Sequence, residues 1–138
     1  AVARERGLAA HTTFTGKIPY HQARDYLALG DVAVAPKLSA TEGSGKILNY
    51  MAMGLPTVAF DTPVSREYLG EKGIYAQAGD AESLALALLH TLAMEPEGSR
   101  ALSRELRRAA VEDYSWERAV HTILLAYKTV CQARSNVL

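Results

Sequence analysis

The sequence predicts an α/β fold with a Rossmann-like open parallel sheet, because apolar runs alternate with amphipathic segments. The run over 32–35 is followed by a glycine-bearing loop, a short amphipathic segment and a second apolar run over 57–60. Neither run alternates with polar residues, as expected for parallel strands covered on both faces. This alternation favours a parallel sheet with right-handed crossovers, flanked by helices.

The elements before the central loop follow from local chemistry. Good helix formers, β-prone residues and well-placed glycine and proline mark their bounds. They are a helix end over 1–6 capped by Gly7, a strand over Thr12-Thr13-Phe14 closed by Gly16, a helix over 20–29 between Pro19 and Gly30, and the strand over 32–35.

The elements after the loop follow in the same way. Apolar residues with helical spacing and recognisable caps predict helices, and β-branched runs predict strands. They are a helix over 46–53 ended by Gly54, strands over 57–60 and 74–76 with a helix over 64–69 between them, and three C-terminal helices over 81–94, 99–112 and 116–132. The first of these three is expected to turn Leu84, Leu88, Leu89 and Leu92 inward, and the last Trp116, Val120, Ile123, Leu124 and Tyr127.

Composition excludes several classes of protein. The 138 residues carry 15 basic and 15 acidic side chains, so net charge gives no support for nucleic-acid binding. Cys131 is the single cysteine and cannot form an intrachain disulfide. No apolar run approaches the ~20 residues of a membrane span, and no signal peptide is visible. A cytoplasmic protein is expected, with one domain and a real core.

The loop over 42–46 is the predicted ligand site, because it joins the carboxyl end of a strand to the start of a helix. Gly43 and Gly45 permit close approach to a ligand and unusual φ values. Ser44, Gly45 and Lys46 would present N–H groups, and Lys46 adds positive charge. A true P-loop is disfavoured, because the expected first glycine and the hydroxyl after the lysine are missing. A plain glycine turn with a solvated lysine stays an alternative.

Two further polar residues suit a sugar better than a bare phosphate. Glu42 at the mouth of the loop accepts hydrogen bonds from hydroxyls, and Asn49 on the next helix both donates and accepts. No metal site or catalytic triad is expected, because the four histidines are widely separated, at His11, His21, His90 and His121.

Four stretches, taken in order, resemble the C-terminal half of retaining GT-B glycosyltransferases of group 1, or family 4. Each motif alone has modest specificity, but the four occur in the family's order, and the match covers nearly the whole chain. They are Phe14-Thr-Gly-Lys-Ile18-Pro, Tyr26-Leu-Ala-Leu-Gly-Asp-Val-Ala-Val-Ala-Pro36, Asn49-Tyr-Met-Ala-Met-Gly54-Leu-Pro-Thr-Val-Ala and Tyr114-Ser-Trp-Glu117.

The resemblance implies a nucleotide-sugar donor site without a metal cofactor. The loop from Glu42 to Lys46 would hold the diphosphate and sugar of a UDP- or GDP-hexose, and Ile18 and Pro36 would lie near the base. Many members carry two glutamates that contact the sugar and the ribose. Here Asn49 stands at the second position when the chain is aligned from Gly54, and its uncharged amide makes a weaker bond. No catalytic residue is assigned, and the acceptor stays open.

The resemblance also implies an incomplete half-domain. Two more strand–helix units, carrying an arginine and a lysine that clamp the diphosphate, would precede Ala1, as would an acceptor domain. The chain alone is therefore expected to be inactive and to self-associate through an exposed sheet edge. The alternative is a non-catalytic α/β binding or assembly domain with a degenerate donor site. A receiver-like domain is disfavoured, because Asp31 precedes its strand rather than following it.

Overall fold

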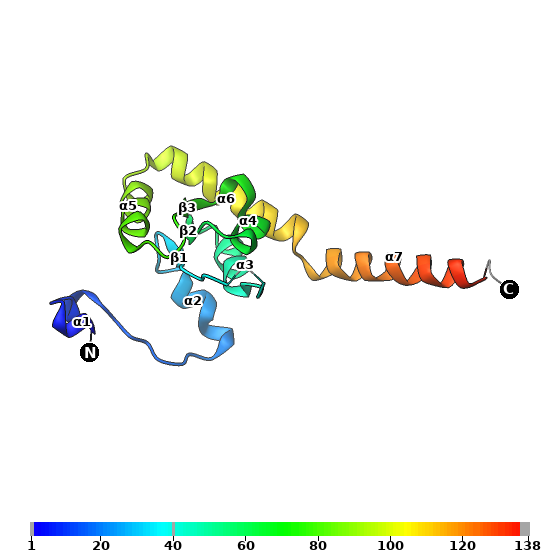
Figure 1. Ribbon diagram of the computed structural model, residues 1–138, viewed down its shortest axis with the longest axis horizontal. Coiled ribbons are helices and arrows are strands. Elements are labelled where there is room, and N and C mark those ends of the chain that lie inside the picture. The colour runs from blue at the N-terminus through cyan, green and yellow to red at the C-terminus, as the bar shows by residue number, and fades with distance from the viewer. Residues whose placement is uncertain (1, 40, 136–138) are drawn as a thin grey trace.

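Three short parallel strands form the sheet in the order β1-β2-β3 (Figure 1). The computed structural model describes residues 2–39 and 41–135. The strands are β1 (Ala33–Ala35), β2 (Thr57–Phe60) and β3 (Ile74–Ala76). Ala59 of the central strand pairs with Ala35 on one side and with Tyr75 on the other. The predicted α/β class and parallel sheet are therefore confirmed.

Helices connect and flank the strands. α3 links β1 to β2, and α4 links β2 to β3. The helices and short 3-10 turns are α1 (Val2–Glu5), η1 (Ala9–His11), η2 (Tyr20–Gln22), α2 (Ala23–Leu27), α3 (Gly45–Ala52), α4 (Pro63–Leu69), η3 (Gly70–Lys72), α5 (Ala81–Leu92), α6 (Pro96–Asp113) and α7 (Trp116–Ser135).

The helices form two layers around the sheet, with α5 on one side and α3 and α4 on the other (Figure 1). α6 packs along α3, which is the most extensive helix–helix contact of the described residues. The core lies between α3, α6 and the sheet and contains Ala35, Ile47, Met51, Ala59, Leu69, Leu106, Ala109 and Ala110. Burial of apolar side chains in this layer is the main stabilising term.

Side-chain caps begin three of these helices. Asp80 accepts hydrogen bonds from the N–H groups of Glu82 and Ser83, at 2.9 and 3.2 Å. Thr62 accepts one from Ser65, and Ser115 one from Arg118. Each cap satisfies N–H groups that a helix leaves without an internal partner. Asp80 and Ser115 therefore define where α5 and α7 begin.

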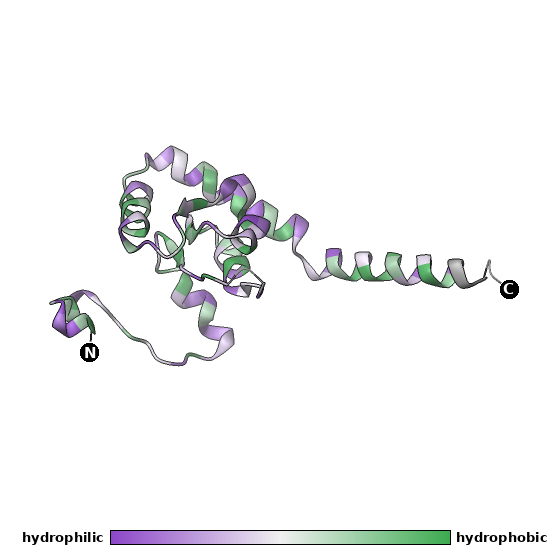
Figure 2. Ribbon diagram, in the orientation of Figure 1, coloured by the Kyte–Doolittle hydropathy of each residue, from purple (hydrophilic) through white to green (hydrophobic). Residues whose placement is uncertain are grey.

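Of the two apolar stripes predicted from periodicity, the one on α5 is right in part and the one on α7 is wrong. On α5, Leu84 and Leu88 are half-buried as expected, but Leu89 and Leu92 are exposed. α7 extends away from the sheet, and its alternating hydropathy is visible along its length (Figure 2). The five residues of its stripe are all at least 50% exposed: Trp116, Val120, Ile123, Leu124 and Tyr127. Periodicity reports that a helix is amphipathic, but it does not supply the surface that would cover the apolar face.

The strand predicted at Thr12-Thr13-Phe14 is also wrong. This segment is irregular, and Phe14 is 82% exposed. β-prone residues form a strand only where a neighbouring strand and a buried face are present. The helix expected over 20–29 is shorter and begins as the 3-10 turn η2. α7 continues helically to Ser135, beyond the end at 132 that the sequence predicted, and residues 136–138 lie outside the described residues.

Candidate functional site

The loop between β1 and α3 lies at the carboxyl end of the sheet, where the sequence predicted the ligand site. Pro36 follows β1 and is exposed, and Ser44 is the N-cap residue of α3. Glu42, Gly43, Gly45 and Lys46 are exposed around it. The structure therefore brings five of the predicted site residues to the start of α3.

Ser44 is buried at this helix start, with 5% of its surface exposed. Its hydroxyl makes no hydrogen bond to the described residues, neither as an N-cap acceptor nor elsewhere. Buried hydroxyl groups are normally paired, because an unpaired one costs free energy. A polar group bound at the start of α3 would give the Ser44 hydroxyl a partner.

The two glycines of the loop differ in what surrounds them. A Cβ on Gly43 would lie 3.1 Å from the Tyr68 hydroxyl, so this glycine lets the loop approach α4 closely. A Cβ on Gly45 would meet nothing within 4 Å. Neither glycine has a positive φ, so the loop does not use the φ values that glycine permits. The space in front of Gly45 is open.

Lys37 organises the loop, and sequence reasoning missed it. Its Nζ lies 3.0 Å from Glu42 Oε2 and donates to the carbonyl oxygens of Glu42 and Gly43, at 3.4 and 3.3 Å. The Ser39 hydroxyl accepts hydrogen bonds from the N–H groups of Thr41 and Glu42. Lys37 directly follows the strand and Pro36, and that position was the signal in the sequence. Glu42 is thus held in an ion pair.

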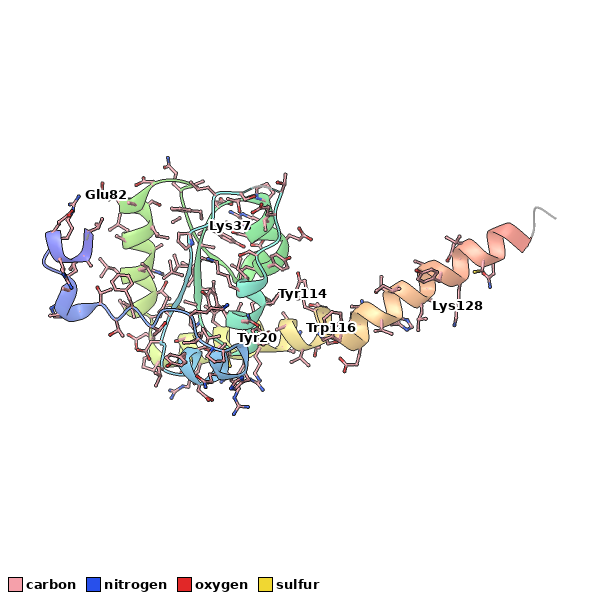
Figure 3. The ribbon with its side chains drawn as sticks, turned by 90° about the horizontal axis from the view of Figure 1, so that it is seen from below. Tyr20, Lys37, Glu82, Tyr114, Trp116 and Lys128 are labelled. Carbon is pink, nitrogen blue, oxygen red and sulfur yellow. The ribbon has the colours of Figure 1, made fainter. Side chains whose placement is uncertain are left out.

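Asn49 is turned toward a different neighbour. Its Oδ1 accepts a long hydrogen bond of 3.5 Å from the Tyr20 hydroxyl. Figure 3 shows Tyr20 well away from Lys37. Asn49 also lines a pocket of about 390 Å³ between α2, α3 and α6, together with Tyr20, His21, Ala23, Arg24, Leu27, Ala52, Met53 and Arg107. The neighbouring Tyr50 packs against the core instead, and burial raises the pKa of its phenol.

Ile18 is the remaining predicted site residue. It is half-buried in the segment that precedes η2. That Ile18 lies near a nucleotide base stays a prediction.

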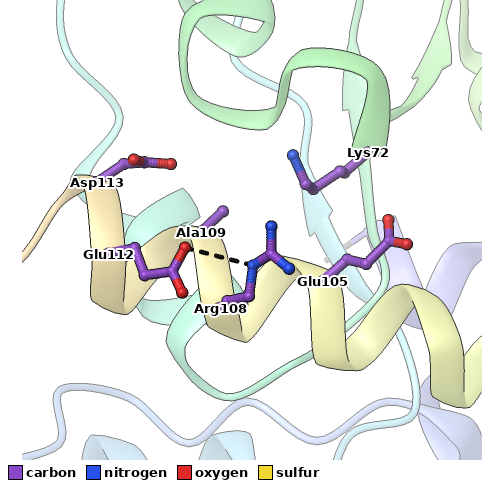
Figure 4. A pocket seen from close by; sticks show the side chains of 6 residues that line it. All are labelled: Lys72, Glu105, Arg108, Ala109, Glu112 and Asp113. Atoms are coloured by element: carbon purple, nitrogen blue, oxygen red, sulfur yellow. Dashed lines mark ion pairs between the residues drawn. The ribbon is translucent and has the colours of Figure 1, made fainter.

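A second pocket lies between α6 and η3 (Figure 4). It measures about 300 Å³ and is lined by Lys72, Glu105, Arg108, Ala109, Glu112 and Asp113. Arg108 is already paired with Glu112 at 3.3 Å. Three carboxylates against two cations make this pocket a poor site for a diphosphate. No group of three or more His, Cys, Asp or Glu side chains among residues 2–39 and 41–135 is arranged to hold a metal ion.

An ion pair stands at the end of the central strand. Arg66 on α4 donates to both carboxylate oxygens of Asp61, at 2.7 and 2.8 Å, and its guanidinium lies 4.1 Å from the centre of the Tyr75 ring. The hydrogen bonds from Arg66 lower the pKa of Asp61. The same bonds raise the pKa of Arg66. The pair fixes the start of α4 against the sheet.

This pair predicts a pH dependence of stability. The folded-state pKa of Asp61 lies below the unfolded value of about 4. The pair therefore stabilises the fold above that value, and its contribution is lost as the pH falls through the folded-state pKa. Between about pH 5 and pH 2, the wild-type chain should lose more unfolding free energy than Asp61→Asn, as measured by urea denaturation. Equal losses in the two proteins would contradict this role.

No helix in the described part of the chain is long and apolar enough to cross a membrane.

Known proteins are similar to this chain in sequence and in fold. A family model described as "Glycosyl transferases group 1" matches residues 1–94. The phosphatidyl-myo-inositol mannosyltransferase of Mycobacterium leprae is 30% identical over 133 residues, which cover 95% of this chain and 35% of that protein. The protein of the same name from Mycolicibacterium smegmatis is 28% identical over 132 residues, covering 94% of this chain and 34% of that protein.

A solved structure agrees with these sequence relatives. Sucrose-phosphate synthase from Thermosynechococcus elongatus superposes with a TM-score of 0.83 at 25% identity, covering 96% of this chain and 33% of that one. The chain thus spans about a third of the length of the curated relatives it matches. It belongs to the group 1 glycosyltransferases, of GT-B fold, as the resemblance in its sequence predicted.

Proposed function

We propose that this chain is the donor-binding, C-terminal part of a longer glycosyltransferase that transfers a hexose with retention of configuration. The donor is a nucleoside-diphosphate sugar such as a UDP- or GDP-hexose, and no metal is required. The observation that carries this proposal is the start of α3, where no described residue fills the space before Gly45 or pairs with the buried Ser44 hydroxyl. Membership in the family and the name of the mannosyltransferase relatives support the choice of a hexose.

The start of α3 suits a diphosphate for electrostatic reasons. N–H groups in the first turn of a helix lack internal partners, and the helix dipole favours an anion there. Lys46 is exposed in this turn and adds a full positive charge within the same region. These groups would stabilise the negative charge that builds on the departing nucleoside diphosphate as the bond to the sugar breaks. The oxocarbenium-like sugar would sit beside the loop over 42–46.

Lys46→Ala tests this assignment. Losing a hydrogen bond to a charged group costs roughly 1.5–3 kcal/mol, so affinity for the correct nucleoside diphosphate should fall about tenfold or more. Calorimetric titration with UDP, GDP and their hexose conjugates measures this, both in the 138-residue chain and in a longer natural protein that carries it. Lys128→Ala is the matched control, because Lys128 is an exposed lysine on α7 (Figure 3). Binding that Lys46→Ala leaves unchanged would contradict the assignment.

A second candidate is a non-catalytic domain with a degenerate donor site. Two observations favour it: Asn49 accepts a hydrogen bond from Tyr20, and Glu42 is held by Lys37. Such a domain would serve assembly through its sheet edges or helices. Titrations in which neither protein binds any nucleotide sugar would favour this candidate over the transferase.

A further inference from the structure

We propose that Lys37 is a positioning residue, which turns the N–H groups of the β1–α3 loop toward the donor diphosphate. This inference rests on the proposed function of the loop. Lys37 lies near the β1 end of the loop and contacts Glu42 and Gly43 near its α3 end. Its side chain is only 30% exposed. Its ammonium meets three oxygen atoms, two of which belong to the main chain of Glu42 and Gly43.

The two main-chain contacts determine the direction of two peptide groups. A trans peptide is planar, and its C=O and N–H bonds point in opposite directions. Because Lys37 attracts the carbonyl oxygens of Glu42 and Gly43, the N–H groups of Gly43 and Ser44 point away from the ammonium. These two N–H groups immediately precede the first turn of α3. A diphosphate at the start of α3 would meet these two N–H groups next to the donors of the first helical turn.

The charge of Lys37 has a separate partner. Glu42 Oε2 lies 3.0 Å from Nζ, so the loop carries a paired charge there rather than a free carboxylate. Pairing reduces the repulsion that Glu42 would exert on a diphosphate. Lys46 remains the exposed cation at the helix start. Lys37 therefore acts on the ligand through the loop, and Lys46 acts on it directly.

The decisive variant is Lys37→Met, which keeps the half-buried methylene stem and removes the donors. In the natural protein that carries this chain, UDP or GDP should bind about tenfold more weakly to Lys37→Met than to wild type. Glu42→Gln removes the ion pair but leaves both carbonyl contacts, so its loss of affinity should be clearly smaller than that of Lys37→Met. Nucleoside diphosphates without a sugar are the probes, so that a direct contact between Glu42 and the sugar does not enter the result.

Amide resonances provide a readout that a merely structural role would not change. In the ¹⁵N-labelled 138-residue chain, UDP or GDP should shift the amide signals of Gly43 and Ser44. In Lys37→Met the same nucleotide should leave them nearly unmoved while circular dichroism stays native. If the methionine variant does not fold, Lys37→Leu, which also lacks a donor, takes its place with the same expectations.

The outcomes separate the two proposals. Wild-type affinity in Lys37→Met would overturn the role of Lys37 and leave the donor site intact. If Glu42→Gln and Lys37→Met lose the same affinity for UDP or GDP, the effect comes from the ion pair. The proposed role of Lys37 in orienting the two carbonyl groups is then overturned. Absence of nucleotide binding in the wild-type protein would overturn the proposed function, and the role of Lys37 with it.

Discussion

Leu106→Ala is expected to lower the free energy of unfolding by about 2–5 kcal/mol. Leu106 lies in the middle of α6, is fully buried and belongs to the core between α3 and the sheet. Its truncation removes apolar contacts and leaves a cavity, because a packed interior relaxes only in part. Urea denaturation of the 138-residue chain measures the change.

Leu89→Ala is the matched control for this prediction. Leu89→Ala is the same leucine-to-alanine substitution on a helix, but 63% of the surface of Leu89 is exposed. Its replacement should alter the free energy of unfolding by no more than about 0.5 kcal/mol. Similar losses for Leu89→Ala and Leu106→Ala would show that the outer face of α5 is covered in solution. Such losses would also support the inward orientation of Leu89 that periodicity predicted.

The contrast between α5 and α6 shows what the sequence determines about packing. α6 has a clear division between charged and apolar positions, and its apolar Leu106, Ala109 and Ala110 are buried. α5 carries leucine on most of its circumference, and spacing cannot decide which of them face the sheet. Here Leu84 and Leu88 face inward beside the buried Thr91, whose hydroxyl donates to the Ala87 carbonyl. Packing against the sheet determines which face of α5 is buried, and this tertiary contact cannot be derived from spacing within the helix.

The candidate site could be located from the sequence but not built from it. A glycine-bearing loop between an apolar strand and an amphipathic helix has only one place in a parallel α/β sheet, at its carboxyl edge. Partners within the loop depend on its three-dimensional path. The ion pair of Glu42 with Lys37 and the contact of Asn49 with Tyr20 both follow from that path. Residue type alone therefore assigned Glu42 and Asn49 to the ligand. It could not show that they contact Lys37 and Tyr20.

The end of α3 carries the second large prediction. Gly54 follows this helix with a φ of 69°, in the left-handed region that favours glycine. A Cβ at this position would lie 3.1 Å from the Ser103 carbonyl oxygen on α6. Gly54 thus serves two purposes: it ends α3, and it lets the backbone of the α3 terminus approach α6 closely.

Gly54→Val is expected to lower the free energy of unfolding by about 2–4 kcal/mol, through strain at positive φ and overpacking against α6. Gly79→Ala and Gly54→Ala form the matched comparison, measured by urea denaturation. Gly79 also has a positive φ, of 81°, but a Cβ there meets only Leu38 at 4.0 Å. Both alanines carry the backbone strain, and only the one at Gly54 adds a tight contact with a main-chain oxygen. The Gly54→Ala loss should therefore exceed the Gly79→Ala loss by about 1 kcal/mol or more. Equal losses would mean that α3 and α6 separate freely at this point, and that close approach of the two backbones contributes nothing to the fold.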